Sequence, residues 1–89
     1  MPCEIEKKLV DFVQTVTTDT SIDPLTDLVL ENVLDSLLLM DLVILIENEM
    51  GVTLLGDEIA PRNFRTLEEL ASLVRVRAAQ QRARDTFAA

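Results

Sequence analysis

Hydrophobic residues near the start of the chain recur at a helical spacing. They follow one another at steps of 4, 3, 1 and 3, which places them on one face of a helix. These residues are Ile5, Leu9, Phe12, Val13 and Val16. The spacing predicts a helix over residues 4–17 whose apolar face packs against another element.

From Thr17 to Asp35 this periodicity is lost. The stretch TTDTSIDPLTD is rich in turn-forming residues, and Pro24 biases the residue before it away from the helical conformation. We therefore expect a long loop with three apolar anchors: Ile22, Leu25 and Leu28. Loops of this length are often functional.

A second helix is predicted over residues 36–50. Asp35 or Ser36 is a favoured N-cap residue, and Gly51 suits the left-handed conformation that ends many helices. A helical wheel gives this helix a sufficient core face: Leu39, Leu42, Val43, Ile46 and Met50. Five apolar residues are left over, and we expect several to face solvent or a partner. They are Leu37, Leu38, Met40, Ile44 and Leu45. The alternative is a helix that is buried on all sides.

The clearest helix begins at Thr66, which has the capping-box spacing to Glu69. Its apolar stripe comprises Leu67, Leu70, Ala71, Leu73 and Val74. Between Gly56 and Pro61 there is room for one short helical turn.

Beyond Val76 the chain remains compatible with a helix but has no stripe of residues to bury. We therefore expect residues 77–89 to form a basic, frayed tail behind a domain of residues 1–76. Within that domain, the predicted fold class is all-α: a small four-helix bundle of three main helices and one short helix, with a long first loop. A chain of 89 residues makes one domain, and with no Trp or Tyr and only three Phe its core is aliphatic.

The formal net charge of −8 disfavours nucleic acid and anionic membranes and favours basic partners. The charge is uneven, with 15 acidic against 4 basic residues over 1–74 and four arginines against Asp85 over 75–89. The longest apolar run is shorter than the roughly 20 residues of a membrane span, and the chain does not begin like a signal peptide. These observations predict a cytoplasmic protein.

The inventory of reactive residues excludes most familiar hydrolytic chemistry. The chain has no histidine and one cysteine, which rules out His-based triads, Cys-His dyads and Cys/His metal sites. No base is available to activate a serine, so we expect neither an enzyme nor a metal site.

Ser36 stands between Asp35 and a long apolar run. The simplest interpretation is that it only begins a helix. A phosphate attached to Ser36 would, however, lie at the positive end of that helix, where a negative charge is stabilised by about 0.3–1 kcal/mol. The position therefore suits a phosphodiester.

The long loop, the sequence LDSL, an apolar helix ending in IENEMGV and a capped last helix together resemble the acyl carrier proteins over about residues 5–75. The resemblance implies that Ser36 carries a 4′-phosphopantetheine arm that holds acyl or aminoacyl groups as thioesters. By the same match, Asp35 and Leu37 flank the attachment site. The protein would then be a carrier and not a catalyst.

The segment EIAPRNFRTLEELASLV resembles free-standing carriers of natural-product pathways, notably those for methoxymalonyl units, and also D-alanyl carriers. Val33 replaces a common glycine and Leu38 a commonly acidic residue, which argues against a housekeeping fatty-acid role. The resemblance thus implies polyketide or related secondary metabolism, with an aminoacyl, peptidyl or D-alanyl carrier as the alternative.

The implied partners are a phosphopantetheinyl transferase and the acyl-loading and acyl-transferring enzymes. The residues expected to dock them lie on the second helix: Leu38, Met40, Asp41, Ile44 and Glu47. We expect a monomer with no nucleic-acid or membrane partner. A hypothesis of a different class is a helical interaction module without covalent cargo, in which Ser36 is dispensable.

Overall fold

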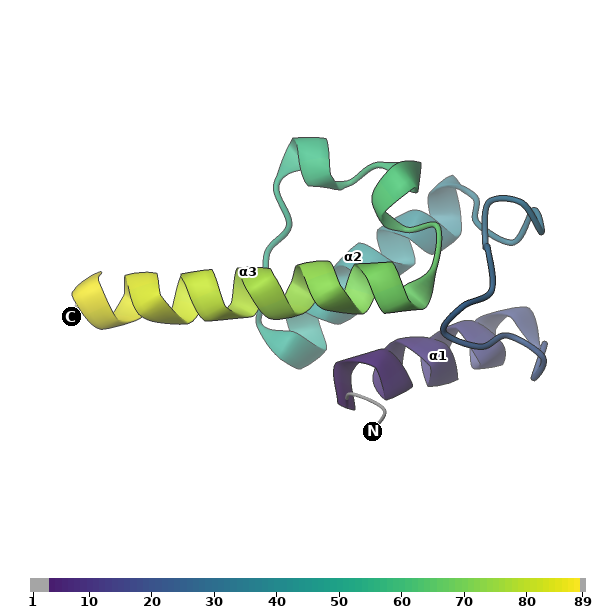
Figure 1. Ribbon diagram of the computed structural model, residues 1–89, viewed down its shortest axis with the longest axis horizontal. Helices are drawn as coiled ribbons and strands as arrows, with labels where there is room; N and C mark the ends of the chain where they lie inside the picture. Colours follow the sequence, from purple (N-terminus) through teal and green to yellow (C-terminus); the bar gives the residue numbers. More distant parts are fainter. Residues whose placement is uncertain (1–3, 89) are drawn as a thin grey trace.

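The computed structural model describes the backbone of residues 4–88 and the side chains of residues 4–81. Over this range the chain is helical and contains no strand. It has three α-helices and two 3₁₀ turns: α1 (Glu4–Thr17), α2 (Ser36–Met50), η1 (Gly56–Glu58), η2 (Pro61–Asn63) and α3 (Leu67–Ala88). In Figure 1, α3 crosses the molecule with α1 on one side and the two 3₁₀ turns on the other, and α2 lies behind it.

The bounds of α1 and α2 agree with the sequence prediction. In α1, Leu9 and Val13 are fully buried and Phe12 is partly buried, so the predicted apolar face is the one that packs against α3. Val16, in the last turn, is about half exposed and does not belong to this face.

All three helices and both loops contribute to one aliphatic core. Its largest member is Phe64, which precedes α3 and is fully buried. The other buried residues are Leu9, Val13, Ile22, Leu28, Leu38, Leu42, Ile46, Val52, Leu54, Leu67, Leu70, Ala71 and Val74. No polar side chain of the described range is buried, so the core is stabilised by apolar burial.

The long first loop is joined to the start of α3 by two backbone hydrogen bonds. The Leu28 N–H donates to the Arg65 carbonyl at 2.7 Å, and the Glu68 N–H donates to the Pro24 carbonyl at 3.0 Å. Of the three predicted anchors, Ile22 and Leu28 are buried but Leu25 is exposed. The Leu25 N–H donates to the Asp23 carboxylate at 2.8 Å in a local turn that leaves its side chain in solvent.

The end of α2 is set by Gly51, which adopts the left-handed conformation at φ 65°. Its N–H donates to the Glu47 carbonyl at 3.1 Å, and the Val52 N–H donates to the Ile46 carbonyl at 3.4 Å. The last carbonyls of α2 thus have partners, as expected of a glycine cap.

In place of the one predicted short helix, the segment before α3 contains the two single turns η1 and η2. The Thr66 hydroxyl accepts the Glu69 N–H at 3.2 Å, which is one half of the predicted capping box. Helix α3 continues to Ala88, so the predicted boundary at residue 76 lies inside it, and the backbone of residues 77–88 is helical where a frayed tail was expected. The chain after Pro61 has no glycine or proline and is rich in alanine, arginine and glutamine, which favour helix.

The helices of the described range include none with the length and apolar character needed to cross a membrane.

Candidate functional site

Asp35 caps the N-terminus of α2. Its backbone is extended, and its carboxylate accepts the Leu38 N–H at 2.8 Å while its carbonyl accepts the Leu39 N–H at 2.9 Å. Of the two candidate caps in the sequence, Asp35 therefore fills this role. Ser36 is the first residue of the helix, and its side chain is exposed.

The turn before α2 fixes the direction in which the chain enters the helix. The N–H groups of Val33 and Leu34 both donate to the Leu28 carbonyl at 2.9 Å. Asn32, just before them, has φ 57°, a left-handed conformation that asparagine tolerates better than most residues. Leu28 is buried in the core and its N–H donates to the Arg65 carbonyl. The turn that leads into Ser36 is therefore anchored to the core and to the start of α3.

A groove of about 300 Å³ lies beside Ser36. Three parts of the chain line it: the first loop with Val29 and Leu34, the start of α2 with Asp35, Ser36 and Leu39, and η2 with Pro61. Four of these six side chains are apolar. The groove thus offers one exposed hydroxyl next to a surface suited to an apolar group.

The start of α2 fits a phosphodiester on Ser36. The first N–H groups of a helix have no carbonyl partner within it, and in α2 the N–H groups of Ser36 and Leu37 remain while Asp35 takes that of Leu38. These groups and the helix dipole favour a negative charge at this end. The flanking apolar groove can accommodate an apolar attachment without polar groups being buried.

The solvent-facing side of α2, away from Leu38, Leu42 and Ile46, presents an exposed strip, which we define as Leu37, Met40 and Ile44. Their side chains are 73%, 46% and 52% exposed. Residues spaced three and four apart share a helix face, so these three form one line along α2. Glu47 continues it in solvent, Asp41 is half-buried, and α2 contains no lysine or arginine. The strip is therefore apolar and is flanked only by acidic charges on its own helix.

Leu38 does not belong to the exposed strip, so its predicted exposure is wrong. Its side chain is only 4% exposed and lies in the core with Leu42 and Ile46. The buried face of α2 is thus centred on the 38–42–46 line, and Leu39 and Val43 of the predicted core face are half-buried at its edge. Nearly every position from 37 to 46 is apolar, so the sequence does not fix the rotation of this helix.

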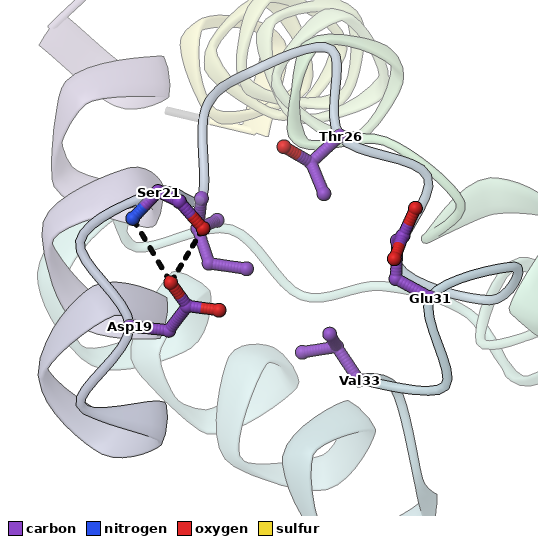
Figure 2. A pocket seen from close by; sticks show the side chains of 6 residues that line it. Asp19, Ser21, Thr26, Glu31 and Val33 are labelled. Atoms are coloured by element: carbon purple, nitrogen blue, oxygen red, sulfur yellow. Dashed lines mark hydrogen bonds between the residues drawn. The ribbon is translucent and has the colours of Figure 1, made fainter.

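A second cavity, of about 320 Å³, lies inside the first loop (Figure 2). Its polar groups serve the loop itself. The Asp19 carboxylate accepts both the Ser21 hydroxyl, at 2.5 Å, and the Ser21 N–H, at 3.0 Å, and the hydroxyl is the larger cause of a lowered Asp19 pKa. Thr26, on the far side of the cavity in Figure 2, bonds with Asp23. The polar groups around this cavity are thus used in hydrogen bonds within the loop, and the cavity is a consequence of how the loop folds.

Of the three residues predicted around the attachment site, Asp35 and Ser36 line the groove and Leu37 does not. The other four lining residues were not among the predicted site residues: Val29, Leu34, Leu39 and Pro61. Pro61 lies in a segment that the resemblance singled out, but nothing in the sequence placed it beside Ser36. Val29 has no local signal, because its position depends on how the loop folds. In the described residues no group of three or more His, Cys, Asp or Glu side chains could hold a metal.

A scan against protein-family models finds no match for the chain, and a search of curated proteins finds no significant match. Function therefore has to follow from the chemistry of Ser36 and its surroundings.

Proposed function

We propose that this protein is an acyl or aminoacyl carrier with a 4′-phosphopantetheine arm attached to Ser36. The observation that carries the proposal is the position of Ser36: an exposed hydroxyl on the first residue of α2, beside an apolar groove. When bound, the arm supplies a thiol that holds an acyl group as a thioester. In this proposal the chain has no catalytic activity of its own.

Asp35 and Ser36 have different roles at the start of α2, and this difference supports the proposal. Asp35 caps the helix through its carboxylate, so the Ser36 oxygen is not needed for capping. No described residue from 4 to 81 forms a hydrogen bond with the Ser36 hydroxyl, so modification there breaks no contact of the fold. The start of α2 provides the attachment point, and the apolar groove beside it can shelter apolar parts of the arm or of a cargo that folds back onto it.

Three further features belong to the proposal as expectations. The two turns η1 and η2 stand where a four-helix carrier has its short helix. The pathway is polyketide or related secondary metabolism, with a D-alanyl, aminoacyl or peptidyl carrier as the alternative. The carrier acts as a cytoplasmic monomer, and its transferase and acyl-transferring partners bind the exposed strip and the acidic residues Asp41 and Glu47.

Intact-mass measurement tests the attachment. The purified protein is incubated with coenzyme A and a broad-specificity phosphopantetheinyl transferase, and we expect one phosphopantetheine per chain. Ser36→Ala should gain none. Ser72→Ala is the matched control, because Ser72 is also an exposed helical serine, and it should be modified like the original protein. The absence of any addition to the folded protein, or an addition that persists in Ser36→Ala, would refute the proposal.

The alternative of a helical interaction module is favoured by one observation, the exposed strip. A helix in a globular domain normally keeps large apolar residues away from water, and Leu37, Met40 and Ile44 do not follow this rule. The two functions differ in their need for Ser36. If a partner acts on Ser36→Ala as it does on the original protein, the interaction module is the correct function.

A further inference from the structure

Glu58 is the centre of the hydrogen bonds that shape the segment between α2 and α3. Its carboxylate accepts the Leu55 N–H at 2.9 Å, and its carbonyl accepts the Asn63 side-chain amide at 2.9 Å. The first bond caps the start of η1, and the second ties η1 to η2. One residue thus links both 3₁₀ turns.

The second oxygen of the Glu58 carboxylate accepts the Nε–H of Arg77 in α3 at 2.6 Å. The two side chains are only 14% and 23% exposed, in contrast to the ion pairs of Arg65, whose guanidinium is 56% exposed. Partial burial weakens the screening of this pair by water and salt. The short distance and the low exposure make it the best-defined ion pair of the described residues.

The ionisation of Glu58 fits this geometry. Burial by itself raises the pKa of the carboxyl, but the Leu55 N–H and then Arg77 outweigh burial, and the pKa lies below its usual value. Glu58 is therefore charged at neutral pH, as the pair with Arg77 requires.

Arg77 belongs to the part of α3 that follows Val74, its last fully buried residue in the described range. One turn later, the Gln81 side-chain amide donates to the Thr53 carbonyl at 2.9 Å and its oxygen accepts the Thr53 N–H at 3.4 Å. Residues 77–81 thus contact the segment between α2 and α3 at two points, Glu58 and Thr53. Figure 1 shows α3 passing alongside this segment before it projects beyond the rest of the molecule.

The segment held by Glu58 forms one wall of the groove beside Ser36. Asn63, the partner of the Glu58 carbonyl, ends η2, and Pro61, the first residue of η2, lines the groove. The Phe64 N–H donates to the Pro61 carbonyl at 3.0 Å, and Phe64 is fully buried. The other walls belong to α2 and the first loop, so η2 is the wall of the groove that Glu58 contacts directly.

We propose that Arg77 and Glu58 are positioning residues that hold η2 against the groove beside Ser36 and so set the room for the apolar part of the cargo. The statement about cargo rests on the proposed function, and the statement about the groove does not. By this inference the first turn beyond residue 76 is an integral part of the site.

Two readouts test the inference in the full chain. The first is the set of ¹³C methyl resonances of Val29, Leu34 and Leu39 in the unmodified protein, which reports on the groove without any arm. The second is the emission of a solvatochromic fluorophore tethered to Ser36 through a pantetheine analogue, which reports on exposure of the attached group to water.

In Arg77→Gln we expect the methyl resonances to move and the emission to shift to longer wavelength, because a loosened wall admits water. We also expect the Leu55 amide to exchange its hydrogen at least about tenfold faster, because the Glu58 carboxylate that accepts it loses its charged hydrogen-bond partner Arg77. Glu58→Gln should give the same changes in the methyl resonances and the emission, and it provides the test should Arg77→Gln not fold. Arg77→Lys, which keeps the charge, should restore the original spectra.

The matched control is Arg75→Gln, because Arg75 lies on the same helix and, among the side chains of residues 4–81, its guanidinium donates only to the Ser72 hydroxyl, at 3.3 Å. It should leave both readouts unchanged. Unchanged methyl resonances and emission in a folded Arg77→Gln or Glu58→Gln would overturn the inference. Failure of Ser36 to accept any arm would refute the proposed function instead, and the methyl resonances would still decide whether Arg77 and Glu58 hold the wall.

Discussion

The two faces of α2 consist of the same kinds of side chain in opposite surroundings. Leu38, Leu42 and Ile46 are buried in the core, whereas the exposed strip places a leucine, a methionine and an isoleucine in solvent. The amino-acid composition of a face therefore does not decide whether that face is buried or exposed. The helix has more apolar surface than the core of a small domain can bury, and the core that it shares with the other elements takes up only the face of Leu38, Leu42 and Ile46.

The difference in burial shows that the two faces of α2 meet different requirements. The buried face holds the domain together, and its removal costs folding free energy. The exposed strip contributes little folding free energy in the isolated chain, and it lies on the helix that begins at Ser36. Substitutions on the two faces should therefore affect different measurements.

The largest expected effect is that of truncating the buried face. Leu42→Ala or Ile46→Ala removes a fully buried side chain and leaves a cavity, so the free energy of unfolding should fall by about 2–5 kcal/mol. Urea-induced unfolding followed by circular dichroism measures it. A loss below about 1 kcal/mol would mean that this face is not the core of the domain.

The neighbours Leu37 and Leu38 give the sharpest comparison, because they are the same residue type on adjacent positions. Leu38→Ala should cost about 2–5 kcal/mol and Leu37→Ala no more than about 0.5 kcal/mol. The same unfolding measurement on the two variants checks this. Equal losses would show that the helix is rotated from the orientation described, or is buried on both sides.

A smaller effect is expected at the N-terminus of α2. Asp35→Ala removes the cap and should cost about 1 kcal/mol. Ser36→Ala changes an exposed residue that caps nothing, and its effect should stay within about 0.5 kcal/mol. Thermal unfolding of the two variants distinguishes them, and a greater loss for Ser36→Ala would assign the cap to the serine.

The smallest effect on stability is expected for Met40→Ala and Ile44→Ala, which should change the free energy of unfolding by no more than about 0.5 kcal/mol. If the exposed strip binds partners, these variants should nevertheless slow pantetheinylation or acyl transfer, by about fivefold where a contact of 1 kcal/mol is lost. Steady-state kinetics with the partner enzyme measures this. Normal kinetics in both variants would leave the strip without a role in binding.

The sequence was sufficient to predict those features of the fold that depend on residues close together in the chain. The apolar spacing from Ile5 onward gave the bounds of α1, and Asp35 and Gly51 marked the ends of α2, because caps and periodicity act over a few residues. The core stripe of α3 followed for the same reason, since it alternates clearly with polar positions.

The sequence was insufficient to predict those features that depend on contacts between residues far apart in the chain. The rotation of α2 could not be read from a run with so few polar residues, and Leu38 was assigned to the wrong face. A frayed tail was predicted because residues 77–89 lack an apolar stripe, and the bonds of Arg77 with Glu58 and of Gln81 with Thr53, far away in the chain, could not be read from the sequence. The groove joins Ser36 to Pro61 and Val29, and their proximity exists only in the folded molecule.

The two backbone bonds between the first loop and the start of α3 also bear on the order of folding. The Leu28 N–H to Arg65 and the Glu68 N–H to Pro24 each close a long stretch of chain that includes all of α2. Neither bond can form before α3 has docked, so we expect the loop to be ordered last and to open first. Native-state hydrogen exchange should then show the Leu28 and Glu68 amides opening together, as one cooperative unit that is less stable than the helical core.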